Sequence, residues 1–266
     1  MNPISIGPLL LAGDRFAAAI GIAVFTFVTT VIARRVDPRL GHWSMHALAG
    51  GFVAARLGHV IDHAANFAAE PWRVFAVWQG GFSWIWGAAA VLAVTLYHLR
   101  TVRLNLWATF AVGVSLVTWN TVYHLTSANA ATPLPAISLS QLNGRPIKLE
   151  SFRGKPLVIN LWATWCPPCR NEMPMMAEFA AATDEVTFLF VNHGEMPATI
   201  KNFLEAEAIE IKHVLLDPDS QVARHYNTRG LPMTLFIGAD GLSRVTYFGE
   251  ISREALSKYV SRLLEE

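Results

Sequence analysis

The stretch WATWCPPCRNE, residues 162–172, contains the only two cysteines of the sequence, Cys166 and Cys169. Two prolines separate them. Thiols at this spacing can form a structural disulfide, contribute to a metal site, or exchange disulfides with other proteins. The residues around the pair decide between these three chemistries.

A redox role explains the position of the pair best. A metal site normally needs three or four ligands, and His193, His213 and His225 have no recognisable ligand spacing to the cysteines. A structural disulfide across two residues closes a loop too short to constrain the unfolded chain much. A buried strand is predicted before Cys166 and a helix directly after it, and amide groups at a helix start favour a thiolate. We therefore expect Cys166 to attack and Cys169 to be the shielded resolving thiol.

The residues after 133 alternate between apolar strands and amphipathic helices. Strands are followed by helices, and two strands precede the last helix. This order predicts an α/β fold with a mixed central sheet. Strands are predicted at 146–152, 156–162, 186–192, 212–217, 232–238 and 243–249, and helices at 167–183, 197–208, 219–226 and 252–266.

The segment VINLWATWCPPCRNEMP resembles the thioredoxin superfamily, and within it the membrane-anchored TlpA, ResA and CcmG group of bacterial thiol–disulfide oxidoreductases. TRGLPMTLFIGADG resembles the Gly-x-Pro-Thr segment of that superfamily, in which the proline is cis and faces the disulfide. The resemblance implies a protein-disulfide reductase. We expect no cofactor and no bound metal. The resemblance also implies that Pro232 is cis and that the Leu231 backbone pairs with an extended substrate. We assign substrate contact to Trp165, Pro167, Leu231 and Pro232.

One departure from ordinary thioredoxins concerns the acid of the site. Thioredoxins place a buried Asp six residues before the first cysteine, where this sequence has Asn160. The TlpA-like group instead has a Glu three residues after the second cysteine, and Glu172 stands there. A carboxyl partly buried beside two thiols has a raised pKa and can exchange a proton with Cys169. We therefore expect Glu172 to be catalytic; the alternative is an exposed glutamate on a helix.

The first half of the chain has the composition of a membrane protein. Hydrophobic residues make up 53% of the sequence and charged residues 15%, against about 25% charged in an average soluble protein. The net charge of +1 gives no electrostatic reason to expect binding to nucleic acid. Four apolar stretches approach the roughly 20 residues that a spanning helix needs, which predicts an all-α transmembrane domain of about four helices. They are 9–33, 44–65, 74–97 and 104–126.

The arginines of the short loops predict the orientation of these helices. Arg34, Arg35 and Arg39 lie between the first and second stretches. Arg100 and Arg103 lie between the third and fourth. Because positive loops stay in the cytoplasm, we expect both termini outside it. The protein is then a multi-pass protein of the bacterial cytoplasmic membrane with its C-terminal domain in the periplasm.

Residues 5–21, 50–63 and 78–90 resemble the first half of prolipoprotein diacylglyceryl transferase. The functional histidine of that family is replaced by Ile85, whose side chain has no ionisable group, and the following glycine by Trp86. The resemblance therefore implies an inactive anchor that keeps a surface for lipid or a partner. The residues that match the two family motifs are Arg56, Leu57, Gly58 and His59, followed by Trp78, Gly80, Gly81 and Ser83.

These observations predict three parts: a transmembrane domain at 1–126, a linker at 127–136 and a thioredoxin-like domain at 137–266. The expected partners are extracytoplasmic proteins with disulfides, membrane lipid, and a transmembrane thiol donor resembling DsbD or CcdA. Such a donor is needed because the membrane half has no cysteine. Two alternatives stay open: a lipoprotein diacylglyceryl transferase with an accessory thioredoxin domain, and a metallochaperone-like binding module.

Overall fold

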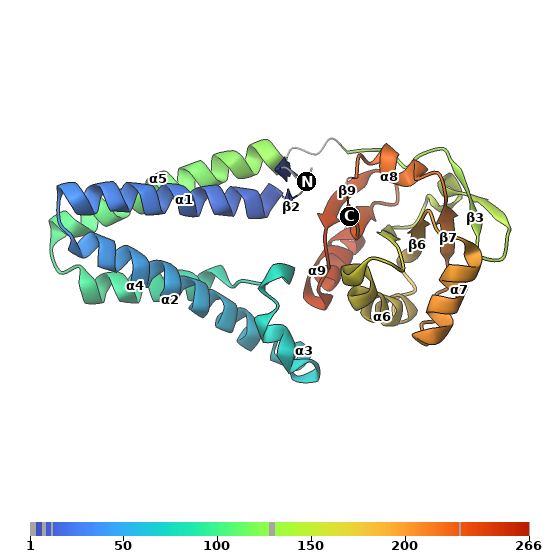
Figure 1. Cartoon of the computed structure of the whole chain (residues 1–266), viewed down its shortest axis with the longest axis horizontal. Coiled ribbons are helices and arrows are strands. Elements are labelled where there is room, and N and C mark those ends of the chain that lie inside the picture. The colour runs from blue at the N-terminus through green and yellow to red at the C-terminus, as the bar shows by residue number, and fades with distance from the viewer. Residues whose placement is uncertain (1–3, 7–8, 12, 128–130, 229, 266) are drawn as a thin grey trace. The chain divides into compact units, whose positions relative to one another are not determined.

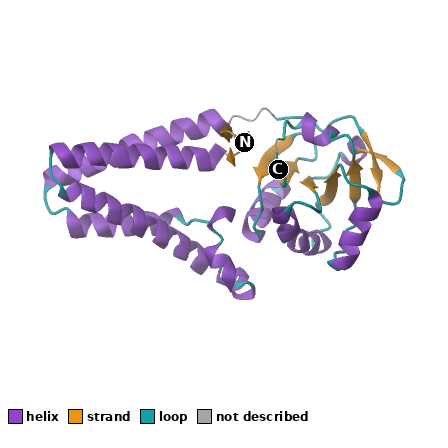
Figure 2. Cartoon of the chain, viewed as in Figure 1, coloured by secondary structure: helices purple, strands orange, loops and turns teal. Residues whose placement is uncertain are grey.

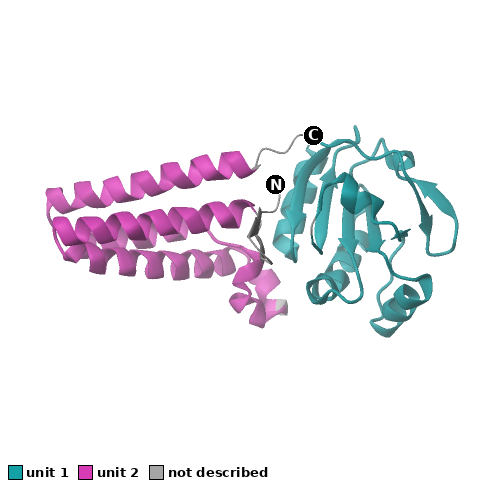
Figure 3. Ribbon diagram, turned by 45° about the horizontal axis from the view of Figure 1, so that its top comes forward, with its two compact units in different colours: residues 1–12, 128–266 teal, residues 13–127 magenta. Residues whose placement is uncertain are grey.

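A computed structural model describes residues 4–6, 9–11, 13–127, 131–228 and 230–265. The chain divides into two compact units (Figure 3). Residues 13–127 form a helical unit, and residues 128–266 together with 1–12 form the other. Near the N-terminus, β1 (Ile4–Ile6) and β2 (Leu9–Leu11) pair as a short antiparallel ribbon. The expected helical first half and mixed-sheet second half are both confirmed (Figure 2).

Two antiparallel helix pairs build the helical unit: α1 lies against α5, and α2 lies against α4 (Figure 1). Phe25, Trp43 and Leu104 belong to the apolar cluster that joins the pairs. The Trp43 indole N–H also donates to the Thr95 hydroxyl at 3.0 Å. The elements are α1 (Gly13–Arg35), α2 (Arg39–Asp62), α3 (Ala64–Ala69), the 3₁₀ helices η1 (Pro71–Phe75) and η2 (Val77–Gln79), α4 (Trp84–His98) and α5 (Val102–Ser127).

Among the residues that the structure describes, two helices, Gly13–Arg35 and Val102–Thr126, are long and apolar enough to cross a membrane. The apolar helix Trp84–His98 is shorter. Its 15 residues would rise about 22 Å, less than the roughly 30 Å of a bilayer's hydrocarbon core. The prediction of one apolar helix over 74–97 is therefore wrong, because the chain between 71 and 83 forms 3₁₀ turns and an extended segment instead.

The surface of the helical unit is rich in large apolar side chains. Phe27, Leu96, Tyr97 and Val117 are each about 70% exposed. Along α4, every residue of which the structure describes, none is buried although the helix is almost wholly apolar. A surface of this kind is costly in water and stable in lipid.

A seven-stranded mixed sheet with the order β4-β3-β7-β6-β5-β8-β9 forms the centre of the other unit. The strands β5, β6 and β7 are parallel, and β8 runs antiparallel to β5. The elements are β3 (Ser138–Gln141), β4 (Pro146–Lys148), η3 (Leu149–Phe152), β5 (Leu157–Trp162), α6 (Pro167–Ala181), β6 (Thr187–His193), α7 (Pro197–Ala206), β7 (Val214–Asp217), α8 (Gln221–His225), β8 (Met233–Ile237), β9 (Ser243–Phe248) and α9 (Arg253–Leu264).

Alternating residues of the central strands fill two apolar cores. Val158 and Trp162 of β5 face the core that contains α6, α7 and α9. Leu157, Ile159 and Leu161 face the core that contains η3 and α8. All six residues of β5 are buried, as a central strand covered on both faces requires. The carboxyl ends of β5 and β6 meet at one edge of the sheet, and the cysteines follow β5 there.

The predicted strand at 146–152 is only partly correct. Strand pairing to β3 stops at Lys148, and residues 149–152 form η3. Leu149 is fully buried in the second core. The Leu149 N–H still donates to the Ile137 carbonyl at 3.1 Å, one residue before β3, and the chain then turns into η3.

Candidate redox site

The two cysteines lie at the junction between β5 and α6. A turn over Ala163–Cys166 leads out of the strand and is closed by a 3.3 Å hydrogen bond from the Cys166 N–H to the Ala163 carbonyl. Cys166 is the N-cap of α6 and forms a disulfide with Cys169. The Cys169 N–H donates to the Cys166 sulfur at 3.3 Å. Cys166 is 3% exposed and Cys169 is fully buried.

The local sequence explains why the helix begins at this point. Pro167 occupies the first position of α6, where a proline loses no helical hydrogen bond and its fixed φ suits the helix. Pro167 and Pro168 have no N–H, so the donor of the first turn that reaches the Cys166 sulfur is the Cys169 N–H. A hydrogen bond to the sulfur at a helix start favours the thiolate. The predicted helix start after Cys166 is confirmed.

Glu172 lies on α6, one turn after Cys169, and is buried with 2% of its surface exposed. Its Oε1 accepts a hydrogen bond from the Asn160 side-chain amide at 2.8 Å. Its Oε2 accepts one from the Ile251 N–H, also at 2.8 Å. Residues three apart on a helix share a face, so the carboxyl and the Cys169 sulfur lie on the same side of α6. The sequence gives Asn160 and Glu172 as two separate observations, and in the structure a hydrogen bond joins their side chains.

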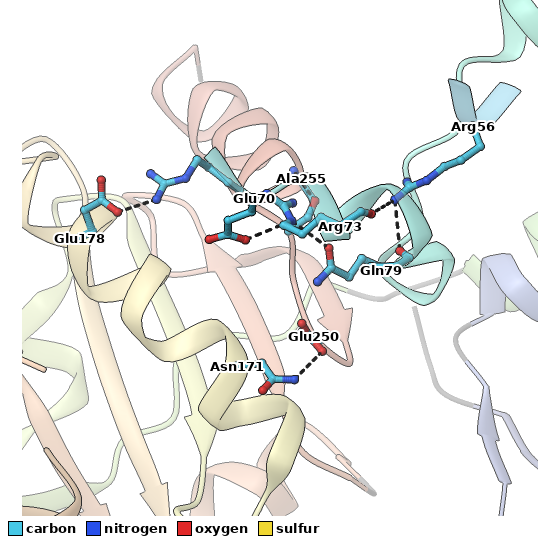
Figure 4. Close-up of polar contacts among 11 residues, drawn as sticks. Arg56, Glu70, Arg73, Gln79, Asn171, Glu178, Glu250 and Ala255 are labelled. Carbon is cyan, nitrogen blue, oxygen red and sulfur yellow. Dashed lines mark hydrogen bonds and ion pairs between the residues drawn. The ribbon is translucent and has the colours of Figure 1, made fainter. Parts of the chain in front are cut away.

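Burial raises the pKa of the Glu172 carboxyl from its usual 4.5 to about 8. The hydrogen bonds from Ile251 and Asn160 lower the pKa by less than burial raises it, and the nearby Glu250 raises it further. In the disulfide form, the carboxyl is therefore mostly protonated at neutral pH. The Asn171 amide donates to Glu250 at 3.5 Å (Figure 4), so α6 contacts two consecutive residues of the β9–α9 connection.

The peptide bond between Leu231 and Pro232 is cis. Pro232 directly precedes β8, whose first residue, Met233, pairs with Leu161 near the end of β5. The cis-proline and the cysteine turn therefore emerge at the same edge of the sheet. The Pro232 carbonyl accepts a 2.9 Å hydrogen bond from the Gly249 N–H.

The two tryptophans of the motif have different environments. Trp165 is 64% exposed beside the buried Cys166, and Pro167 is exposed as well. Trp162 is fully buried, and its ring lies 5.6 Å from that of Phe203. Trp165 and Pro167 can therefore touch a protein that approaches Cys166, whereas Trp162 belongs to the core.

One residue near the cysteines was not predicted from the sequence. Glu195, in the connection from β6 to α7, accepts hydrogen bonds from the Thr164 N–H and from the Asn192 amide, both at 2.7 Å. The Thr164 hydroxyl also donates to it. Thr164 is two residues before Cys166, but Glu195 is 31 residues from Thr164. Nothing in the local sequence indicates this contact.

In the helical unit, the Arg56 side chain donates to the Arg73 carbonyl at 2.5 Å (Figure 4). It is 6% exposed. Its guanidinium has five N–H donors, and five hydrogen bonds reach backbone carbonyls of the segment 73–81. The guanidinium also lies over the rings of Phe67 and Phe82, at 5.5 and 5.9 Å from their centroids. Arg56 thus holds the 3₁₀ segment in place, and positive φ angles at Gly80 and Gly81 allow the sharp turn.

The two substituted positions of the second motif lie at the start of α4. Ile85 is exposed. The Trp86 ring packs directly on Gly58, where an added Cβ would come within 2.2 Å of its ring atoms. The indole therefore fills the space beside the Arg-x-Gly motif, and no ionisable group stands at position 85.

The three histidines considered as metal ligands are separate. His193 ends β6 beside Ser220, and the His225 ring contacts the Pro133 carbonyl at 2.7 Å. His213 stacks edge-on against Phe152. Within the described residues, no group of three or more His, Cys, Asp or Glu side chains is placed to hold a metal ion.

Comparison with known proteins gives a match to each half of the chain. Residues 130–245 match the AhpC/TSA family, and residues 4–122 match the prolipoprotein diacylglyceryl transferase family. Thiol-disulfide oxidoreductase ResA of Geobacillus thermodenitrificans is 30% identical over 140 residues, which cover 52% of this chain and 80% of that protein. ResA of Bacillus subtilis is 30% identical over 137 residues, or 51% and 76% of the two chains.

Solved structures are similar to the same half. A thioredoxin-family thiol:disulfide interchange protein from Chlorobium tepidum is 28% identical, with a TM-score of 0.46 over 51% of this chain and 98% of that one. The matches to ResA cover most of each relative. The chain therefore belongs to the ResA-type family of thioredoxin-like thiol:disulfide oxidoreductases.

Proposed function

We propose that this chain is a membrane-anchored reductase of protein disulfides that works outside the cytoplasm. The observation that carries the proposal is the dithiol site itself: Cys166 at the start of α6, Cys169 behind it, and a buried carboxyl one turn further on. The direction of the reaction, reduction rather than oxidation, follows the TlpA-like resemblance of the sequence.

The reaction begins with the reduced pair. The Cys166 thiolate attacks one sulfur of a substrate disulfide, forms a mixed disulfide and releases the first substrate thiolate, which takes a proton from water. The Cys169 thiol then loses its proton and attacks the Cys166 sulfur. The second substrate thiolate leaves, and the Cys166–Cys169 disulfide remains. Two electrons pass from the chain to the substrate.

Glu172 is the group that exchanges a proton with Cys169. In the disulfide form it is mostly protonated at neutral pH, because its pKa is about 8. When an external dithiol reduces the disulfide, Cys169 leaves as a thiolate and takes this proton. In the next cycle Cys169 returns the proton to the Glu172 carboxylate before it attacks. The proton thus alternates between sulfur and carboxyl, and the chain needs no exposed base.

Asn160 suits both protonation states of this carboxyl. In the structure its amide donates to Glu172 and, at 3.2 Å, to the Thr234 hydroxyl. Its Oδ1 is buried and has no hydrogen-bond partner among the described residues. A half-turn of the amide would let Oδ1 accept from a protonated Glu172 and from Thr234 instead. An Asp at this position would add a second buried negative charge, which the amide avoids.

The substrate contacts Trp165, Pro167, Leu231 and Pro232. The first two are exposed beside Cys166, and the cis-proline segment emerges at the same edge of the sheet. An extended segment of the substrate pairs with the Leu231 backbone while its disulfide reaches Cys166. The substrates are extracytoplasmic proteins with disulfides.

The helical unit is the membrane anchor, with four spans: α1, α2 and α5 form three, and α4 together with the segment 71–83 before it forms the fourth. Its apolar exterior supports this assignment. The Arg34–Arg39 and Arg100–Arg103 clusters lie at one end of the unit, because Ile32, Leu40, Leu99 and Leu104 share one apolar cluster there. At the other end, Arg56 and Arg73 are buried. The arginine-rich end therefore faces the cytoplasm, and residues 127–266 lie in the periplasm.

This topology sets the parts and partners of the protein. Residues 1–126 are the anchor, 127–136 the linker and 137–266 the redox domain. Lipid surrounds the anchor. A separate membrane protein resembling DsbD or CcdA supplies thiol electrons, because both cysteines belong to the redox domain. We assign no acyl-transfer step to the anchor: its motif arginine donates to backbone carbonyls, and position 85 carries no ionisable group.

Equilibration of the purified full chain with glutathione buffers tests the proposed direction. A reductase should have a potential below the glutathione poise of about −220 to −260 mV, and an oxidant a potential closer to the −120 mV or so of DsbA. The reduced chain should also reduce a model protein disulfide, and Cys166→Ser should abolish this activity. A potential near that of DsbA would contradict the proposed direction.

A further inference from the structure

The turn that carries Cys166 is tied to the neighbouring strand by one side chain. The strands β5 and β6 are parallel, and their last paired residues are Trp162 and Asn192. Beyond that pair the two chains separate, one toward α6 and the other toward α7. Glu195 spans the gap: its carboxylate accepts from the Thr164 N–H and hydroxyl on one side and from the Asn192 amide on the other.

The base of this contact is rigid. Asn192 is 1% exposed within β6. It bonds Glu195 twice, since its amide donates to the carboxylate and its Oδ1 accepts from the Glu195 N–H at 3.2 Å. A buried strand residue therefore fixes the direction of the Glu195 side chain. The carboxylate in turn occupies both donors of Thr164, the second residue of the Ala163–Cys166 turn.

We propose that Glu195 is a positioning residue of the redox site, which fixes the cysteine turn by accepting both donors of Thr164. In this role Glu195 acts on the Cys166 sulfur only through Thr164. The inference rests on the proposed function, because its consequence is the placement of Cys166 for attack and of Trp165 for substrate contact.

The geometry predicts which substitutions matter. In Glu195→Gln, the side-chain oxygen can still accept from the Thr164 N–H and the Asn192 amide, while its NH₂ donates to the Thr164 hydroxyl. All three contacts survive without the charge. Glu195→Asp shortens the side chain by one methylene, and Glu195→Ala removes every contact. We therefore expect the glutamine variant to stay closest to the wild type and the other two to be impaired.

The experiment uses the full chain in detergent micelles and two readouts. The first is kcat/KM for reduction of a model protein disulfide. The second is the rate of Cys166 alkylation by iodoacetamide across a pH series in a Cys169→Ser background, which needs no substrate. Misplacing a reacting group by about 1 Å can cost on the order of 100-fold, so we expect a loss of about 10- to 100-fold in Glu195→Ala. Glu205→Ala is the matched control, since Glu205 is an exposed glutamate of α7 paired with Lys201.

Three results would overturn the proposal: wild-type rates in Glu195→Ala, an equal loss in Glu205→Ala, or a loss in Glu195→Gln as large as in Glu195→Ala. An equal loss in Glu195→Gln would mean that the site needs the negative charge of Glu195 and not its hydrogen bonds. If Glu195→Ala fails to fold, Thr164→Val carries the test, because it removes one of the two turn contacts and should cause a smaller loss in both readouts. The two proposals can fail separately. If the wild type does not reduce the model disulfide but Glu195→Ala still slows Cys166 alkylation, the reductase function is refuted and the positioning role of Glu195 stands.

Discussion

Raising the pH should destabilise the oxidised protein through one group, the buried carboxyl of Glu172. Its pKa is about 8 in the folded chain, against a usual value of 4.5. Between these two values the folded state holds a proton that the unfolded state has lost. Unfolding then releases a proton, so the free energy of unfolding falls as the pH rises. The stability that the protonated Glu172 contributes is fully present below a pH of about 4.5 and is lost as the pH rises through about 8.

The size of the effect follows from the same two values. Each pH unit between them changes the free energy of unfolding by about 1.4 kcal/mol. Over the whole interval the loss is on the order of 5 kcal/mol, an upper figure for a group that stays fully buried. This is a large share of the 5–15 kcal/mol or so that stabilises an ordinary domain.

Denaturant unfolding of the oxidised full chain at several pH values, followed by circular dichroism, measures this slope. Glu172→Gln keeps the shape of the side chain and removes its titration, so its stability should vary less with pH. The difference between the variant and the wild type should grow in favour of the variant as the pH rises. Glu178→Gln is the control, because Glu178 lies on the same helix with its side chain 69% exposed.

Parallel pH profiles for Glu172→Gln and the wild type would refute the reasoning. They would mean that the carboxyl titrates near its usual value, as an exposed helix glutamate does. The same slope change in Glu178→Gln would assign the effect to the general charge of the helix. Infrared difference spectra of the neutral carboxyl, compared between wild type and Glu172→Gln, give the pKa directly and separate these outcomes.

Three further predictions concern the site and the anchor. Asn160→Ala removes a hydrogen bond that lowers the pKa of Glu172, so the infrared titration should move to higher pH, and an unchanged titration would exclude the contact. Reporter fusions after Leu40 and after Ala131 should report opposite sides of the membrane; the same side for both would exclude the four-span topology. Arg56→Met should increase protease cleavage within 70–83, because buried carbonyls lose their donors at about 1–3 kcal/mol each. It should leave disulfide exchange unchanged, and loss of exchange would contradict its assignment to the anchor.

The parts of the site that could be predicted are those determined by neighbours in the sequence. The helix start after Cys166 follows from the prolines at 167 and 168 and from the buried strand before them. The cis peptide before Pro232 was expected from a short motif and is present. Glu172 was expected to be partly buried, since it lies one turn from Cys169 on the inner face of the same helix.

The contacts that were missed join residues far apart in the sequence. Ile251, which donates to Glu172, is 79 residues away, and Glu195 is 31 residues from Thr164. No local pattern contains such pairs, because they depend on how the connections after neighbouring strands meet. The same reason applies to the segment 74–97. Its composition favours a helix, but in the structure the Arg56 guanidinium donates five hydrogen bonds to backbone carbonyls of the bent segment 73–81.

Trapping of the mixed disulfide tests the central claim most directly. Membranes that contain the Cys169→Ser variant should accumulate covalent adducts of this chain with extracytoplasmic proteins, because the resolving thiol is gone. Reductant should release the adducts, and Cys166→Ser should form none. Adducts that persist in Cys166→Ser, or their absence in Cys169→Ser under conditions where the wild type reduces protein disulfides, would contradict exchange through Cys166 as the attacking thiol.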